Sequence, residues 1–216
     1  MIDEITWLAE RQCVDASGHS VLMSRELTPE ELVSRIAGDA SPVRRTACHL
    51  GELTGRQVND VLDELYDWIH DGLALRHGRD GDWSFAVCYG GWPGALEDPG
   101  AVSRGGAHVF HLEYEEENGK PVPPQFAYYH DGRYRCGFNL HLDHSWGYDG
   151  VDGDPELSRR IETMLAAAGL PEEDPDDLEA VHRASLDVLG QVFGLALPRQ
   201  RIVEGTLDAV VLEEAD

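Results

Sequence analysis

Alternation of apolar and polar residues with a period of two dominates the middle of the chain. In the first such run the bulky residues fall on one side: Trp83, Phe85, Val87 and Tyr89. Side chains at positions i and i+2 point to the same face of a β-strand. An Asp80-Gly81 pair precedes the run, and Asp-Gly is typical of tight hairpin turns. Residues 73–76 and 83–89 therefore predict a β-hairpin.

Further runs of the same kind occur at residues 108–115, 126–129 and 134–143. Asn-Gly at 118–119 and Asp-Gly at 131–132 predict the turns next to them. In the last run we expect the apolar residues to share one face: Tyr134, Cys136, Phe138, Leu140 and Leu142. Successive hairpins of this type favour an antiparallel meander with one buried and one wetter face.

Two capped helices are predicted before the strands. Thr28 and Glu31 form a capping box with Pro29 between them, and Gly38 ends that helix. Thr54 and Gln57 form a second box. The apolar stripe behind the second box has helical spacing and runs up to an expected end at Asp71-Gly72: Val58, Val61, Leu62, Leu65, Trp68 and Ile69.

Helical signals return after the strands. A helix is predicted from Asp154-Pro155 to Gly169 and another from Asp174-Pro175 to Gly194. A short helical segment follows Leu197-Pro198 and leads to an acidic tail at 213–216. The predicted fold is a single α+β domain over residues 1–216, with a central antiparallel meander sheet covered by N-terminal and C-terminal helices.

The charge of the chain is strongly negative. Its 17 Lys and Arg residues face 41 Asp and Glu residues, which gives a net charge of -24. Such a surface repels polyanions, so the composition argues against nucleic-acid binding and against anionic membranes. The same field favours a basic protein partner, while oligomeric state stays open.

The beginning of the sequence lacks the basic start and apolar stretch of a secretory signal, and charges interrupt every apolar run before it reaches membrane-spanning length. The cysteines Cys13, Cys48, Cys88 and Cys136 form no Cys-x-x-Cys pair. We therefore expect a cytoplasmic protein with reduced, mostly buried thiols.

Catalytic and cofactor motifs are missing from the sequence. No Gly-x-Ser-x-Gly elbow occurs, and the glycines at 90–94 lack the Lys and the Ser or Thr of a phosphate-binding loop. No cofactor is expected. The 41 carboxylates do not single out an acid–base pair, because general acid–base chemistry needs two carboxylates in different environments.

Histidines in the predicted sheet provide one alternative. His141 and Asp143 would lie on one strand face, with His144 next to them. His111 or Glu113 would join them if their strands were neighbours. Imidazole and carboxylate are common ligands of transition metals. This pattern predicts either a small metal-dependent or ligand-binding enzyme or, in the blander interpretation, solvent-facing strand histidines.

A dense acidic segment and two loop tryptophans provide the other alternative. The acidic residues are Glu172, Glu173, Asp174, Asp176, Asp177 and Glu179. They fit a solvated loop leading into a helix N-terminus, and equally a patch that receives a basic partner. Trp92 and Trp146 are candidate anchors on loops, although a loop tryptophan also serves as a lid over the core.

Four landmarks also occur in a characteristic order. They are the run from Cys13 to Leu27-Thr28-Pro29-Glu30-Glu31, the strand 81–87 followed by Gly91-Trp92-Pro93-Gly94, the turn Val102-Ser103-Arg104-Gly105, and the element 189–195. The arrangement resembles an uncharacterised bacterial domain-of-unknown-function family. This resemblance covers most of the chain and implies an intracellular α+β domain in which a Cys-bearing strand leads to the first helix. It implies no reaction, substrate or catalytic residue.

The leading hypothesis is a non-catalytic acidic interaction domain, of the regulatory or immunity type, that binds a basic partner. The metal-dependent or ligand-binding enzyme is the alternative. Sensing of a small molecule in a pocket between sheet and helices is a third possibility.

Overall fold

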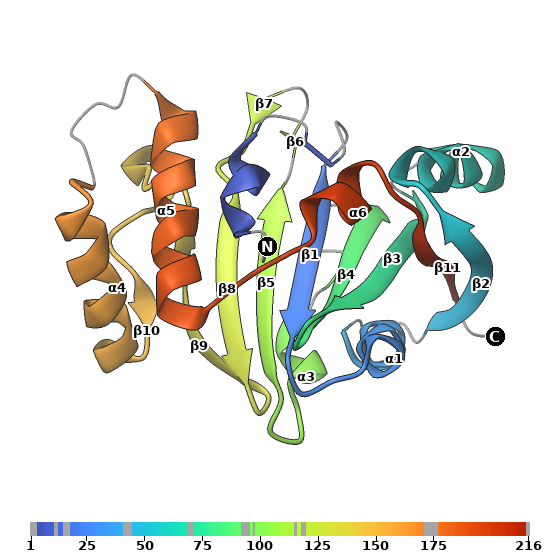
Figure 1. Ribbon diagram of the computed structural model, residues 1–216, viewed down its shortest axis with the longest axis horizontal. Helices are drawn as coiled ribbons and strands as arrows, with labels where there is room; N and C mark the ends of the chain where they lie inside the picture. Colours follow the sequence, from blue (N-terminus) through green and yellow to red (C-terminus); the bar gives the residue numbers. More distant parts are fainter. Residues whose placement is uncertain are drawn as a thin grey trace.

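The computed structural model describes residues 4–10, 13–14, 18–40, 45–68, 71–91, 96, 98–114, 116–117, 120–170 and 177–214. A nine-stranded sheet in which every pairing is antiparallel forms its centre (Figure 1). The strands are, in spatial order, β10 (Asp152–Gly153), β9 (Arg133–Asn139), β8 (Gln125–His130), β5 (His108–Tyr114), β1 (His19–Ser24), β4 (Trp83–Gly90), β3 (Leu73–Asp80), β11 (Leu207–Glu214) and β2 (Arg45–Leu53). The predicted α+β class with a central antiparallel sheet is confirmed.

Helices cover both faces of this sheet. They are η1 (Ile5–Ala9), α1 (Pro29–Asp39), α2 (Gly55–Leu65), α3 (Pro99–Val102), η3 (His144–Trp146), α4 (Pro155–Ala167), α5 (Leu178–Phe193) and α6 (Arg199–Val203). One core cluster joins α1 and α3 to the sheet, and the other joins η1, α2, α4, α5 and α6 to the opposite face. Alternation divides a strand between the two, so Val21 lies in one cluster and Leu22 in the other.

The two hairpins with Asp-Gly turns are confirmed. β3 pairs with β4 across the turn at Gly81, and β8 pairs with β9 across Asp131 and Gly132. Asp131 and Gly132 both have positive φ, at 51° and 74°. This is the backbone conformation that favours tight antiparallel hairpins. The predicted turn at 118–119 lies outside the described residues, between the short strands β6 (Glu116–Glu117) and β7 (Lys120–Pro121).

The strand order differs from a simple meander in two places. β1 lies between β4 and β5, and β11 lies between β3 and β2. Every residue of β1 is buried, and β11 carries the uninterrupted apolar run 209–212. A strand that is buried on both faces does not alternate in sequence. The alternation criterion therefore missed β1 and β11, and it also missed β2.

The capping signals before α1 and α2 are confirmed as reciprocal boxes, Thr28 with Glu31 and Thr54 with Gln57. The strand that leads into α1 is β1, and Cys13 lies before it rather than within it. These side-chain caps satisfy backbone N–H groups that have no partner inside the helix.

The end of α2 was predicted wrongly. Tyr66 leaves the helical conformation directly after Leu65, and its ring packs against Gly72, where a Cβ would lie 2.4 Å from the ring. Leu65 and Trp68 are therefore 52% and 63% exposed instead of belonging to the core stripe. Ile69 lies outside the described residues.

Asp154 caps α4 and Gly194 ends α5 in the left-handed conformation, as predicted. The described start of α5 is capped by Asp177, and the expected start at Asp174-Pro175 lies outside the described residues. No helix within the described ranges is both long and apolar enough to span a membrane.

Arg76 is a fully buried cation beneath α6. Its guanidinium donates to the carbonyl oxygens of Leu53, Ile202, Gly205 and Arg201 at 2.8–3.4 Å and to the Tyr89 hydroxyl at 2.9 Å. No described carboxylate lies within ion-pair distance of it. Backbone carbonyls and one phenol thus replace the water that a buried guanidinium requires.

A row of four rings, in stacked, tilted and edge-to-face contact, crosses the face beneath α5. The ring centroids of His19 and Tyr114 are 4.6 Å apart, those of Tyr114 and His182 are 5.7 Å apart, and those of His182 and His141 are 5.6 Å apart. Burial, with smaller contributions from His141 and Arg183, lowers the pKa of His182 to about 3. His182 is therefore a neutral core residue near neutral pH.

Replacing Arg76 tests its role in the sheet. Arg76→Lys should lower the free energy of unfolding by about 3 kcal/mol, because one ammonium group cannot reach all the acceptors of the guanidinium. Urea denaturation measures this loss. Arg159→Lys, on the exposed face of α4, is the control and should change stability by less than about 0.5 kcal/mol. Equal effects of the two changes would contradict the assigned role.

The low pKa of His182 predicts loss of stability in acid. As the pH falls, His182 is protonated in the unfolded chain before it is protonated in the folded chain. The stability that neutral His182 contributes to the folded state is therefore complete above the ordinary histidine pKa of 6.5, and it is lost as the pH falls toward about 3. Between pH 7 and pH 5, the free energy of unfolding of His182→Phe should fall by up to about 2 kcal/mol less than that of the parent protein. Urea titrations at the two pH values measure this difference. Leu178→Phe, at the exposed start of the same helix, removes no titratable group and is the control, which should retain the parent's pH dependence.

Candidate functional site

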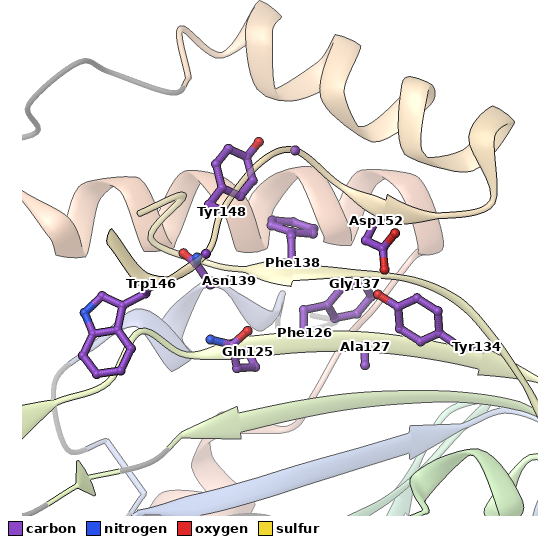
Figure 2. A pocket seen from close by; sticks show the side chains of 12 residues that line it. Gln125, Phe126, Ala127, Tyr134, Gly137, Phe138, Asn139, Trp146, Tyr148 and Asp152 are labelled. Atoms are coloured by element: carbon purple, nitrogen blue, oxygen red, sulfur yellow. The ribbon is translucent and has the colours of Figure 1, made fainter. Parts of the chain in front are cut away.

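A groove opens beside β8 and β9, under the loop that leads from β9 to β10 (Figure 2). Its volume is about 290 Å³. Aromatic, small and polar side chains line it: Gln125, Phe126, Ala127, Tyr134, Gly137, Phe138, Asn139, Trp146, Gly147, Tyr148, Gly150 and Asp152. Tyr134 and Trp146 lie at opposite ends in this view. They are 43% and 46% exposed, so both rings can contact a ligand.

Tyr134 reaches the groove because β9 carries a bulge. Cys136 pairs with Tyr128 while Tyr134 pairs with Tyr129, which leaves Arg135 as an extra residue. The extra residue shifts the alternation, so residues on the two sides of a bulge do not keep the faces that a regular strand would give them. The Tyr134 ring therefore lies with Tyr129 at 5.7 Å and over Gly137, away from the core face of Cys136. The expectation that Tyr134 shares the face of Cys136 is wrong for this reason.

Trp146 is positioned by a hydrogen-bonded loop. Asp143 caps η3 by accepting hydrogen bonds from the backbone N–H and the hydroxyl of Ser145, each at 2.7 Å. Asn139 anchors the loop through two bonds to the Asp143 backbone. Gly147 then ends η3 with φ 82°, a conformation that glycine adopts at little cost. The loop holds Trp146 outward as a consequence of these bonds.

Small residues form the floor of the groove and leave space above the strands. Ala127 and Gly137 pair across β8 and β9. A Cβ on Gly137 would lie 2.6 Å from the Phe126 carbonyl oxygen and 2.6 Å from the Tyr134 hydroxyl. Glycine is thus required where the Tyr134 hydroxyl lies over the strand.

The electrostatics of the groove favour a cation. Figure 2 shows the Asp152 carboxylate near the phenol oxygen of Tyr134, and burial together with this charge raises the pKa of Tyr134. Arg135, the nearby cation, is already paired with Asp154 at 3.0 Å. Among the described residues, Asp152 has no ion-pair partner. A carboxylate beside the exposed face of Tyr134 can bind an ammonium or guanidinium group.

A second hollow of about 350 Å³ lies between η1 and the end of α5. Its lining has two carboxylates, Glu4 and Asp187, but neither an aromatic nor a histidine side chain. It offers fewer features that could recognise a ligand than the groove does.

Three residues of the predicted metal site, His141, Asp143 and His144, follow β9 in the chain, but their side chains have different contacts. His141 is partly buried against His182, and burial lowers its pKa while Asp143 opposes the shift. The hydrogen bonds from Ser145 lower the pKa of Asp143. His144 is exposed, with its ring 5.5 Å from Tyr148. Asp143 therefore holds the loop, while His141 contributes to packing.

His111 and Glu113 lie on the opposite face of the sheet. Their neighbours in β5, Phe110, Leu112 and Tyr114, belong to the core beneath α5, so alternation directs His111 and Glu113 away from it. The structure does not bring them to His141. In the described part of the chain, no group of three or more His, Cys, Asp or Glu side chains could hold a metal ion.

The acidic segment and Trp92 are placed only in part. Trp92, Glu172, Glu173, Asp174 and Asp176 lie outside the described residues. Asp177 accepts a hydrogen bond from the Ala180 backbone at the start of α5, and Glu179 pairs with Arg183 at 2.8 Å. Asp177 and Glu179 therefore stabilise α5 itself.

Sequence reasoning identified Trp146 but missed Tyr134 and Asp152. Tyr134 was assigned to the core by its alternation with Cys136, and the bulge that reverses it leaves no mark in the sequence. Asp152 could have been flagged only as one acid in a Gly- and Asp-rich loop. Its relevance comes from the pairing of β10 with Gly137, which places it next to Tyr134.

Comparison with known proteins gives a family and no function. Neither the curated proteins nor the solved structures include a match to this chain. Residues 2–215 match the family of unknown function DUF6461. The match spans nearly the whole sequence and agrees with the resemblance to an uncharacterised family. The chain therefore belongs to DUF6461, a family of unknown function.

Proposed function

We propose that this chain is a cytoplasmic, non-catalytic interaction domain of the regulatory or immunity type, which binds a basic protein partner. The observation that carries the proposal is the groove with the exposed Tyr134 ring next to the Asp152 carboxylate at one end and the exposed Trp146 ring at the other. In this proposal a Lys or Arg side chain of the partner enters the groove. Its cationic group stacks on Tyr134 and pairs with Asp152, and a second basic side chain of the partner stacks on Trp146 at the other end.

Each of these contacts contributes a modest binding free energy. A cation stacked on an exposed aromatic ring contributes about 0.5–1 kcal/mol, and an exposed ion pair contributes at most about 1 kcal/mol. The net charge of -24 adds long-range attraction for a basic partner. This attraction accelerates association and selects against acidic competitors. The groove supplies local recognition within that field.

The state of the cysteines supports the proposed compartment and the absence of thiol catalysis. Cys13, Cys48, Cys88 and Cys136 are all free. Burial raises the pKa of Cys88 and of Cys136 to about 12 and that of Cys13 to about 11. Thiols with such pKa values are poor nucleophiles at neutral pH. They behave as small apolar core residues.

A labelled Arg-rich octapeptide tests the groove. At about 150 mM NaCl, where long-range attraction is screened, Trp146→Ala should weaken binding about two- to fivefold. Asp152→Asn should weaken it by a similar factor, because the guanidinium loses its carboxylate. Fluorescence anisotropy measures both dissociation constants. A peptide with Gln in place of Arg should bind neither the parent nor the variants.

Matched substitutions elsewhere separate the groove from the overall field. Asp60→Asn on α2 changes the net charge by the same amount as Asp152→Asn, and Leu178→Ser on α5 removes another exposed hydrophobic side chain. Both should leave octapeptide binding within about twofold of the parent. If Asp60→Asn weakens binding as much as Asp152→Asn, attraction is diffuse and the groove is not the site.

A further inference from the structure

β2 forms one edge of the nine-stranded sheet. β2 is the last strand of the sheet, and among the described residues its pairing is with β11 alone (Figure 1). It is nine residues long, whereas β10 at the opposite edge has two residues. A long edge strand presents backbone N–H and C=O groups that can pair with another extended chain.

A bulge limits the usable part of this edge. The pairing with β11 passes from Gly51 to His49, so Leu50 is an extra residue. The regular run at this end of the strand is therefore 45–49. Bulges twist an edge and interrupt pairing. An added strand would align with these five residues before meeting the irregularity.

Exposed apolar side chains lie beside the same end of β2. Leu65 and Trp68, at the end of α2, are among the large hydrophobic residues with the greatest exposure. Tyr66, between them, packs its ring against Gly72, and the adjacent Leu73 pairs with Leu212, whose other partner is Ala47 of β2. The end of α2 therefore lies near this end of the strand. An exposed aromatic and aliphatic pair near an edge strand is typical of a binding surface.

Carboxylates surround these apolar residues. All of the following are exposed: Asp63, Glu64, Asp67, Glu213 and Glu214. The first three flank Leu65 and Trp68 in sequence, and the last two end β11, where Glu213 and Glu214 pair with Thr46 and Arg45. The edge therefore combines backbone groups, apolar contacts and negative charge.

We propose that the edge of β2 at residues 45–49 binds an extended segment of a basic partner protein as a tenth strand. The apolar side chains of that segment pack on Leu65 and Trp68, and its basic side chains face the surrounding carboxylates. A second copy of this chain fits poorly, because it would bring an identical acidic rim and a further -24 charge to the contact. This surface is separate from the groove and does not depend on it.

A peptide with alternating Lys and Val, about six residues long, provides the probe. Two N-methylated versions keep its charge and side chains while each removes the backbone donors of one edge. The unmodified peptide should bind, one methylated version should bind at least about tenfold more weakly, and the other should retain binding. Equal binding of the two methylated versions, or no binding of the unmodified peptide, would overturn strand addition.

Protein variants locate the contact. Trp68→Ala and Leu65→Ser should each weaken binding of the alternating peptide by at least about fivefold. Leu178→Ser at the exposed start of α5 and Val203→Ser at the exposed end of α6 are the matched controls, and both should bind like the parent. If Trp146→Ala in the groove loses as much as Trp68→Ala, the peptide occupies the groove instead.

Sedimentation of the free protein tests the other occupant. The parent should remain monomeric at about 150 mM NaCl, where charge repulsion still acts between close surfaces. A dimer that Trp68→Ala dissociates would assign this edge to a second copy and overturn the proposal. Failure of this test would leave the groove proposal intact, because the two surfaces share no residue.

Discussion

The buried guanidinium of Arg76 is the interaction on which half of the sheet depends. It joins β3 to the end of β2 through Leu53, to β4 through Tyr89, and to α6 through Ile202. Among the described residues this guanidinium has no carboxylate partner. Such a buried charge is tolerated in a core only if each of its N–H donors finds an acceptor. The carbonyls at the end of α6 meet this need. α6 and the turn after it thereby become part of the sheet's framework, and they set the direction in which β11 enters.

At the other end of the sheet, backbone irregularity rather than charge shapes the surface. The extra residue in β9 turns Tyr134 to the outer face, Gly137 lets the ring lie on the strand, and the bonds of Asn139 and Asp143 hold Trp146 outward. None of these features adds to the hydrophobic core. Each restricts the conformation of residues near the groove, which is how a rigid scaffold supports recognition by loops.

Local signals in the sequence predicted the elements that local physics determines. The capping boxes at Thr28 and Thr54 and the Asp-Gly turns at 80–81 and 131–132 involve residues within a few positions of each other. β1 and β11 depend on burial between distant strands, so their sequences lack alternation. The groove depends on one bulge, and the separation of His111 from His141 depends on which face of β5 packs beneath α5. Such facts arise only when the sheet is assembled.

The insertion of β11 between β3 and β2 has a consequence for synthesis of the chain. β2, β3 and β4 are all made early, yet β2 cannot join the sheet until residues 207–214 emerge to bridge it to β3. Until then the facing edges of β2 and β3 are both unpaired. Completion of the sheet therefore requires a contact over more than 150 residues, as between Glu52 and Asp208, and contacts of this separation form slowly. During that interval a nascent chain has two additional edges through which it can pair wrongly.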